Sequence, residues 1–205
     1  MAVLSESLFC NVMTTLTLIC GVDEAGRGPW AGPVTAGAVI LNPDKPIAGL
    51  TDSKKLSEKK RLLLEPEIKS KAAYWAVAHA TPREIDEMNI REATFLAMQR
   101  AIAGLGICPE QIIVDGNALP AQLPAPATAI IKGDLTEPAI SAASILAKNA
   151  RDRLMVTMCE AYPDYGFSLH KGYGTAAHAE ALSRLGPCIH HRTSFAPVRR
   201  AAATG

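Results

Sequence analysis

The stretch that decides the fold is Gly21-Val22-Asp23-Glu24-Ala25-Gly26-Arg27-Gly28. The residues before it, 16–22, are mostly apolar and β-branched, so we expect a buried strand that ends near Asp23 and Glu24. Neighbouring strand residues point to opposite faces, so the two carboxylates can share a site only where the strand breaks, and the glycines favour such a break. Two carboxylates beside an arginine that can grip phosphate oxygens indicate a metal site that acts on a phosphate.

Two other interpretations of this stretch stay open from its residues alone. A glycine-capped Asp-Glu turn with a solvated arginine has the same composition. A dinucleotide-binding loop shares the spacing of Gly26, Gly28 and Gly32, but Pro29 and Pro33 remove amide donors. Residues 34–41 also read as a second strand and not as the helix that such a loop requires.

Composition and charge limit the possible functions. The chain has 205 residues, of which 48% are hydrophobic, enough for one domain with a full core. Because the formal net charge is only +1, affinity for nucleic acid must come from local basic patches and from metal ions. Two patches fit, although each could also be a solvated surface: Lys54, Lys55, Lys59, Lys60 and Arg61, and then His190, His191, Arg192, Arg199 and Arg200.

The five cysteines are scattered and lack zinc-binding spacing, which is typical of reduced thiols in a cytoplasmic protein. Residues 1–16 are expected to be a disordered N-terminal extension, with translation starting at Met1 or at Met13. They lack the basic start and cleavage site of a signal peptide and are too short and polar to span a membrane. We expect a catalytic domain over residues 17–187 and a C-terminal basic segment over residues 188–205.

Apolar runs that alternate with helical patterns predict an α/β fold with a mixed β-sheet flanked by helices. Strands are expected at residues 16–23, 34–41, 74–78, 111–114 and 127–131. Helices are expected at residues 59–73, 82–103, 138–162 and 175–185. The second helix has the clearest start, because Thr81, Pro82 and Glu84 form a capping box.

Three of these strands deliver acidic residues at or just beyond their C-terminal ends, namely Asp23 with Glu24, Asp115, and Asp134. Any one of them could be a turn or helix cap. Four carboxylates at one sheet edge repel one another unless cations neutralise them, and hard oxygen ligands suit Mg²⁺ or Mn²⁺ better than zinc. Two such ions can activate water and stabilise the leaving oxygen of a phosphodiester. The pattern therefore predicts hydrolysis of a nucleic-acid backbone.

From about Leu18 to Arg200 the chain resembles the bacterial ribonuclease HII family, a group of type 2 ribonucleases H. The matching motifs, in order, are residues 21–28, Asp52-Ser53-Lys54-Lys55-Leu56, Val114-Asp115-Gly116-Asn117, Lys132-Gly133-Asp134, residues 141–148, and His170-Lys171-Gly172-Tyr173-Gly174-Thr175. The resemblance implies a ribonuclease-H-like mixed sheet flanked by helices, with a small C-terminal helical segment. It also implies an endoribonuclease that hydrolyses the RNA strand of RNA/DNA hybrids and nicks DNA 5′ of embedded ribonucleotides. Two-metal-ion catalysis would leave 3′-hydroxyl and 5′-phosphate ends.

The same resemblance implies roles for individual residues. The catalytic, metal-binding acids would be Asp23, Glu24, Asp115 and Asp134, with Mn²⁺ or Mg²⁺ as cofactor. The substrate-binding residues would be Gly26, Arg27 and Gly28 at the 2′-hydroxyl and scissile phosphate, Tyr173 on the sugar at the RNA-to-DNA junction, and Ser53, Lys54 and Lys55 in a phosphate-contacting loop. We expect further phosphate contacts from Lys148, Arg151, Lys171 and Arg192, and a structural ion pair for Asp152. The partners would be RNA/DNA hybrid and ribonucleotide-containing duplex DNA, bound by a monomer with no membrane association.

Two other classes of function remain. A nuclease of the same fold that acts on branched or all-DNA substrates would share the four acids but would have no use for the glycine-arginine-glycine motif and Tyr173. A non-catalytic nucleic-acid-binding module would need the basic patches but not the acids, since unneutralised carboxylates repel phosphate.

Overall fold

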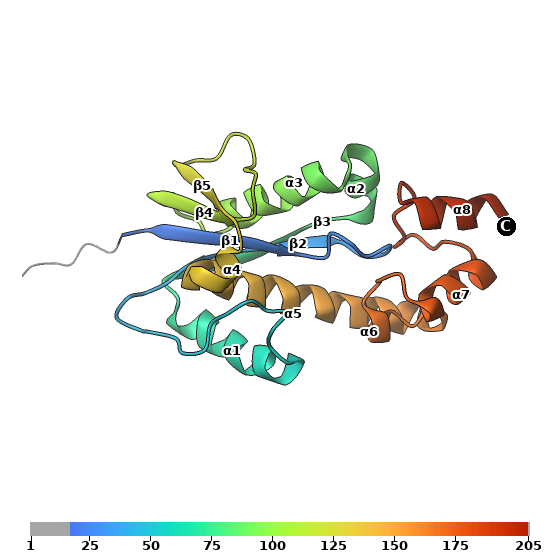
Figure 1. Ribbon diagram of the computed structural model, residues 1–205, viewed down its shortest axis with the longest axis horizontal. Helices are drawn as coiled ribbons and strands as arrows, with labels where there is room; N and C mark the ends of the chain where they lie inside the picture. The colour runs from blue at the N-terminus through green and yellow to red at the C-terminus, as the bar shows by residue number, and fades with distance from the viewer. Residues whose placement is uncertain (1–16, 205) are drawn as a thin grey trace, which may run out of the picture.

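A five-stranded mixed β-sheet forms the centre of the computed structural model, which describes residues 17–204 (Figure 1). The strands, in chain order, are β1 (Ile19–Ala25), β2 (Val34–Ile40), β3 (Tyr74–Ala80), β4 (Gln111–Asp115) and β5 (Ala127–Ile130). Their spatial order is β3-β2-β1-β4-β5. The first three strands pair antiparallel, while β4 and β5 run parallel to β1. The carboxyl ends of β1, β4 and β5 therefore meet at one edge of the sheet.

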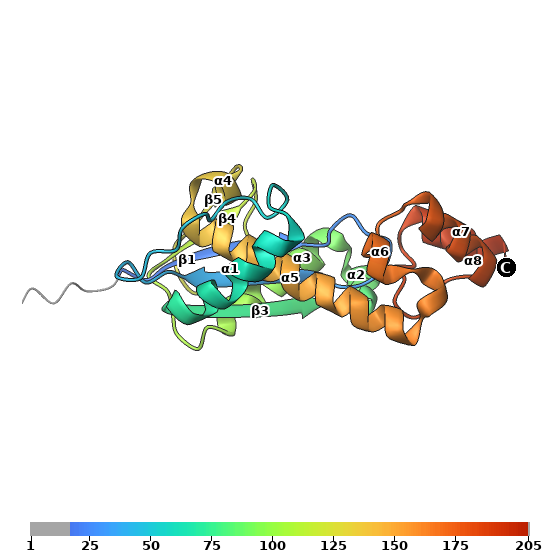
Figure 2. The same ribbon diagram turned by 90° about the horizontal axis from the view of Figure 1, so that it is seen from below.

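Helices cover both faces of this sheet. The helices that precede the C-terminal segment are α1 (Glu58–Lys71), α2 (Pro82–Met88), α3 (Ile90–Ala103), α4 (Gly133–Thr136) and α5 (Pro138–Ala161). Helix α3 packs on one face of β2 and β3, and α5 packs on the other face of β1 and β2, with α1 beside it (Figures 1 and 2). The alternation along β2 follows this division: Ala36 and Ala38 belong to the core under α3, whereas Val39 belongs to the core under α5.

The backbone of helix α5 packs directly against the sheet at two glycines. A Cβ atom on Gly21 would lie 2.2 Å from the carbonyl carbon of Ala139, and one on Gly37 would lie 2.4 Å from the carbonyl oxygen of Ala143. No side chain fits at either position without moving the helix backbone. The small residues of α5, among them Ala142, Ala143 and Ser144, complete this close contact.

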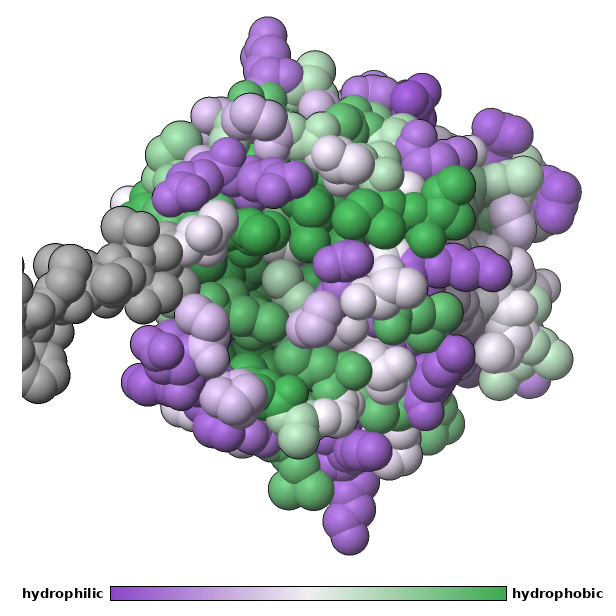
Figure 3. Space-filling view, turned by 60° about the vertical axis from the view of Figure 1, so that its left-hand side comes forward, coloured by the Kyte–Doolittle hydropathy of each residue, from purple (hydrophilic) through white to green (hydrophobic). Residues whose placement is uncertain are grey.

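The remaining helices gather beyond one end of the sheet (Figures 1 and 2). They are the 3₁₀ turn η1 (Pro163–Tyr165) and the helices α6 (Phe167–His170), α7 (Ala176–Leu185) and α8 (Ala196–Thr204). At the other end, where the described chain enters β1, hydrophobic and hydrophilic residues lie side by side on the surface (Figure 3). No helix of residues 17–204 is long and apolar enough to cross a membrane.

The single helix expected over residues 82–103 is wrong. The capping box of Thr81 and Glu84 is present, but the helix it begins ends at Met88. Asn89 then adopts a φ of 74°, and its side chain accepts hydrogen bonds from the backbone N–H groups of Arg91 and Glu92, which starts α3. With φ 74° and ψ 164° this residue lies outside the helical region, so the first helix cannot continue through it, and its carboxamide caps the new helix.

The expected domain boundaries stay predictions. Residues 1–16 lie outside the described residues. Residues 188–204 contact the loop between β1 and β2: the backbone N–H of Arg192 donates to the Trp30 carbonyl at 2.8 Å, and His191 forms a β-bridge with Ala31. A boundary at residue 187 stays a prediction.

Candidate active site

Three carboxylates meet at the edge where the parallel strands end. One oxygen each from Asp23, Asp115 and Asp134 lies within 4.8 Å of the others, the one such group of potential metal ligands among the described residues. Asp23 is in β1, Asp115 is the last residue of β4, and Asp134 lies in the first turn of α4. The backbone N–H of Asp134 donates to Asp115 at 3.4 Å, which ties α4 to the strand.

This cluster holds more negative charge than its surroundings neutralise. Burial raises the pKa of Asp23 well above its usual range, and the charges of Glu24 and Asp115 raise it further. Burial raises the pKa of Asp134 too, with added repulsion from Asp115 and Asp52. A divalent cation would relieve this repulsion, and oxygen-only ligands suit such an ion. The residues present therefore fit a divalent cation.

Glu24 lies on the other face of the sheet from Asp23. The glycines end the strand as expected, at Gly26, where φ is 96°, but β1 continues to Ala25, so the break follows both acids and does not turn them to one face. The Glu24 carboxylate lies 3.7 Å from the Arg27 guanidinium. Burial raises the pKa of Glu24, Arg27 acts against that effect, and Asp115 adds to it, so Glu24 still shares the field of the cluster.

The glycine-arginine-glycine loop and Tyr173 border one pocket beside the acids. Its volume is about 240 Å³, and its lining includes Glu24, Gly26, Arg27, Gly28, Ser53, Lys54, Lys148 and Tyr173. The Arg27 side chain is 54% exposed and Tyr173 is 45% exposed, so both can reach a ligand. A Cβ on Gly28 would lie 3.8 Å from the Tyr173 ring. The structure thus brings together residues from four separate motifs.

Comparison with known proteins shows the family of the chain that carries this site. The family profile described as Ribonuclease HII matches residues 20–198. Ribonuclease HII of Hyphomonas neptunium (strain ATCC 15444) is 64% identical, over 91% of this chain and 97% of that protein. The chain belongs to the ribonuclease HII family. It is a hydrolytic ribonuclease H enzyme, as its motifs implied.

Solved structures of ribonucleases HII and H2 share this fold. Ribonuclease H2 from Pyrococcus horikoshii OT3 superposes with a TM-score of 0.76 at 28% identity, covering 91% of this chain and 97% of that one. The RNase HII of Archaeoglobus fulgidus, solved in complex with PCNA, gives a TM-score of 0.74 at 27% identity, with coverages of 87% and 95%. The expected ribonuclease-H-like α/β fold is confirmed.

The loop at residues 52–56 presents Lys54 to the acids. Partial burial alone would lower the pKa of Lys54, but the carboxylates of Asp23 and Asp52 more than offset it, so the pKa is raised. Ser53 was expected to contact the substrate; its side chain is only 3% exposed, and its hydroxyl lies 2.9 Å from that of Ser144. In this structure Ser53 supports the loop from inside, and Lys54 and Lys55 form the accessible side.

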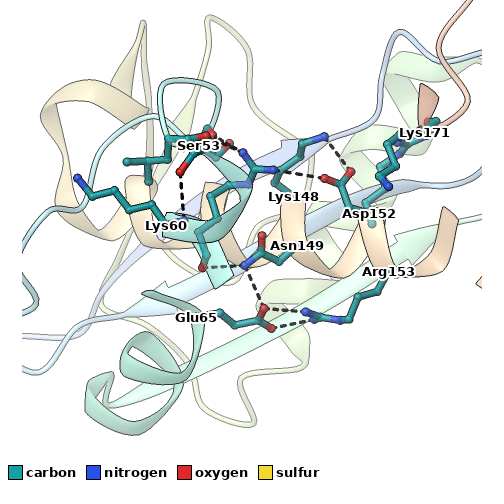
Figure 4. Close-up of polar contacts among 12 residues, drawn as sticks. Ser53, Lys60, Glu65, Lys148, Asn149, Asp152, Arg153 and Lys171 are labelled. Carbon is teal, nitrogen blue, oxygen red and sulfur yellow. Dashed lines mark hydrogen bonds and ion pairs between the residues drawn. The ribbon is translucent and has the colours of Figure 1, made fainter. Parts of the chain in front are cut away.

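A polar network on α5 anchors this loop (Figure 4). Arg61 donates to the Ser53 carbonyl at 3.1 Å and lies 3.5 Å from Asp152, so its place in an exposed basic patch was wrong. Lys148 pairs with Asp152 at 2.8 Å, which confirms the structural ion pair expected for Asp152. Nearby, the Asn149 side chain donates a hydrogen bond to the Glu65 carboxylate at 3.0 Å, and Arg153 forms an ion pair with the same carboxylate.

Two of the expected phosphate contacts are wrong. Arg151 and Arg192 are 1% and 0% exposed, and each of their guanidinium groups is surrounded by backbone carbonyls of the same protein. His191, expected on a basic surface patch, is 2% exposed. Lys171 donates to the Ser168 carbonyl.

Sequence reasoning also missed residues that line the site. Ser144 donates a hydrogen bond to Asp23, and this bond lowers the pKa of that acid. A second cavity of about 400 Å³ on the α3 side of Glu24 is bordered by Arg91, Phe95 and Asn117. The small-residue run of α5 and the residues after Asp115 could have suggested Ser144 and Asn117, but nothing in the sequence links Arg91 to the acids.

Proposed function

We propose that this ribonuclease HII cleaves the RNA strand of RNA/DNA hybrids and nicks duplex DNA on the 5′ side of an embedded ribonucleotide. The products would end in 3′-hydroxyl and 5′-phosphate. The observation that carries the proposal is the carboxylate group of Asp23, Asp115 and Asp134 beside a pocket bordered by Arg27 and Tyr173. The family membership and fold support RNA as the cleaved strand.

In this proposal Asp23, Asp115 and Asp134 hold divalent cations, with Glu24 completing the acid set. Mn²⁺ or Mg²⁺ fits these oxygen donors, and the bound ions would activate water and stabilise the leaving oxygen. Ser144 keeps Asp23 oriented through its hydrogen bond. The charge of Lys54 limits the repulsion between the acids and an approaching phosphate.

The loop and Tyr173 supply the selectivity. Only the 2′-hydroxyl distinguishes RNA from DNA at a single nucleotide, so recognition needs donors and acceptors close to one sugar. Glycines at positions 26 and 28 let the backbone approach it, the exposed Arg27 guanidinium can grip the adjacent phosphate, and the Tyr173 ring offers a flat face to the sugar.

We further propose that the enzyme works as a monomer in the cytoplasm. The cysteines of the described region, Cys20, Cys108, Cys159 and Cys188, are all free thiols, which supports a reducing compartment.

The test uses three end-labelled duplexes: DNA with one ribonucleotide, an all-RNA/DNA hybrid, and all-DNA. We expect nicking immediately 5′ of the ribonucleotide and cleavage of the hybrid with Mn²⁺ or Mg²⁺, and no cleavage with chelator or of all-DNA. Cleavage of the hybrid alone would contradict the proposed activity on single ribonucleotides. Cleavage of all-DNA would indicate a deoxyribonuclease of the same fold. A protein that binds all three duplexes and cuts none would be a binding module.

A further inference from the structure

Three carbonyls of the loop between β1 and β2 accept hydrogen bonds from one buried arginine. Arg192 donates from Nη2 to the Gly26 carbonyl at 2.6 Å, from Nη1 to that of Arg27 at 2.9 Å, and from Nε to that of Gly32 at 2.9 Å. These three bonds use all three guanidinium nitrogens. The side chain is therefore committed to the shape of this loop and has no route to solvent or substrate.

A second buried arginine joins the same loop to Tyr173. Arg151 donates to the carbonyls of Pro33 at 3.0 Å and Ala31 at 3.1 Å, and its Nη1 donates to that of Lys171 at 2.9 Å. Its guanidinium carbon also lies 5.9 Å from the centre of the Tyr173 ring, within the range of a cation–π contact. Arg151 thus contacts the turn that carries Tyr173 in two ways, through the Lys171 carbonyl and through the Tyr173 ring.

Close packing leaves this arrangement little freedom. A Cβ on Gly26 would lie 2.0 Å from Nε of Arg151, and one on Gly172 would lie 2.5 Å from the Ala31 carbonyl oxygen. The Trp30 N–H donates to the Gly172 carbonyl at 2.8 Å. The loop and the Tyr173 turn therefore behave as one unit, with the two arginines at its centre.

Neither arginine is neutralised in the usual way. In residues 17–204 no carboxylate forms an ion pair with Arg151 or Arg192. Burial, together with the neighbouring charge of Arg151, lowers the pKa of Arg192 to about 9. A buried charge without a counter-ion is costly for folding, and well-packed apolar residues are often at least as stabilising. Stability alone is therefore a weak reason for two arginines here.

The geometry of the peptide bond links Arg192 to the substrate side of the loop. In a trans peptide the C=O and the following N–H point in opposite directions. With the Gly26 and Arg27 carbonyls turned toward Arg192, the N–H groups of Arg27 and Gly28 must point away from it. Neither N–H donates to any acceptor within the described part of the chain, and both residues line the pocket that Tyr173 also borders.

We propose that Arg192 and Arg151 are positioning residues for ribonucleotide recognition. Arg192 fixes the peptide planes so that the Arg27 and Gly28 N–H groups face the nucleic acid, and Arg151 fixes the separation between those groups and Tyr173. This inference rests on the proposed function, because it explains how the loop reads one sugar. The two arginines do not touch the substrate, and their effect is on selectivity rather than on metal binding.

The test measures selectivity without catalysis. In an Asp115→Asn parent, which prevents cleavage, duplex affinity is measured for DNA with one ribonucleotide and for all-DNA, and the ratio of the two dissociation constants reports ribose recognition. Adding Arg192→Lys keeps the charge but leaves one nitrogen for three carbonyls. We expect the ratio to fall roughly tenfold, the worth of one to two hydrogen bonds. Mn²⁺ affinity, measured in the otherwise wild-type chain carrying Arg192→Lys, should be unchanged.

Controls separate this effect from loss of stability and from failure of the proposed function. Ile68→Val, in the core under α1, destabilises the fold away from the pocket and should keep the parent ratio. If Arg192→Lys does not fold, Arg151→Lys takes its place, and the ratio should again fall. An unchanged ratio in a folded arginine variant, or an equal fall in Ile68→Val, would overturn the positioning role. If the Asp115→Asn parent binds both duplexes equally, the proposed recognition of the ribonucleotide fails, and this inference fails with it.

Discussion

The acid cluster and the buried arginine pair are both concentrations of like charge, but they differ in what is left for a ligand. Asp23, Asp115 and Asp134 face one another, with few internal donors to occupy their oxygens. In Arg151 and Arg192 every guanidinium nitrogen already donates to a backbone carbonyl. Charge therefore does not mark a binding site in this enzyme; unused hydrogen-bonding or coordinating capacity does.

The largest effect should come from a change in the acid cluster, whose oxygens have few internal hydrogen-bond donors. Asp115→Asn removes one charge and one ligand oxygen from the group, and metal ions contribute several kcal/mol to such transition states, so we expect a rate loss of roughly 10³-fold or more. Duplex binding should be largely retained. Single-turnover nicking and filter binding measure the two quantities, with the exposed Asp164→Asn as matched control. Near-normal turnover in Asp115→Asn would mean that these carboxylates do not hold the catalytic ions.

Arg27 is an arginine of the opposite kind: its side chain is 54% exposed, and its contact with the Glu24 carboxylate is as long as 3.7 Å. Arg27→Ala should lower kcat/KM on a single-ribonucleotide duplex by roughly 10²-fold, as expected for a lost charge-assisted contact to the reacting phosphate. Calorimetric Mn²⁺ affinity should not change. The matched control is Arg83→Ala, at an exposed arginine that forms an ion pair with Glu87. A full-rate Arg27→Ala enzyme with its ribonucleotide preference intact would assign that contact elsewhere.

A pair of buried histidines extends the comparison to pH. The Cys188 N–H donates to Nδ1 of His191 at 3.0 Å, so Nε2 of His191 carries the proton and donates to Nε2 of His178 at 3.1 Å. Nδ1 of His178 then donates to the Tyr173 carbonyl at 2.9 Å. Protonation of either ring places two N–H groups face to face. Burial, and then the neighbouring His178, lower the pKa of His191 from 6.5 to about 4.

The unfolded chain binds this proton more readily than the folded chain does. The contribution of His191 to folding stability is therefore fully present above pH 6.5 and is lost as the pH falls toward 4. The raised pKa values of Asp23 and Asp134 act in the opposite direction, so the comparison must be between variants. We expect His191→Gln to flatten the Tm decrease between pH 7 and pH 5 by a few degrees, at roughly 2–4 °C per kcal/mol. Parallel Tm curves for the two proteins would show that the pair does not titrate as described.

The smallest effect is expected at a satisfied polar contact outside both charged regions. Thr81 caps α2 by accepting from the Glu84 backbone while Glu84 accepts in return, and Arg100 pairs with Glu84 at 2.6 Å. Thr81→Ala should lower the free energy of unfolding by about 1 kcal/mol. Its kcat and ribonucleotide preference should match the wild type. A marked loss of activity would show instead that the start of α2 influences the site.

The acids could be located from the sequence because their positions follow from local rules. Apolar runs ending in Asp115 and Asp134 predict parallel strands, and the carboxyl ends of such strands meet at one edge. The arginines could not be located in this way. Arg192 looks like part of a basic patch in the sequence, and only the carbonyls of a loop more than 150 residues earlier show that it is buried. Asn89 was missed for a local reason: its left-handed φ interrupts an otherwise helical pattern.

The most direct test of the metal site is the position of Mn²⁺ in crystals soaked with that ion, found by anomalous scattering. We predict a peak at about 2.0–2.2 Å from carboxylate oxygens of Asp23, Asp115 and Asp134, as expected for small hard divalent cations. No peak should lie near Arg151 or Arg192. Ordered Mn²⁺ at other carboxylates, with none at these three, would contradict the assignment of the catalytic ions to this cluster.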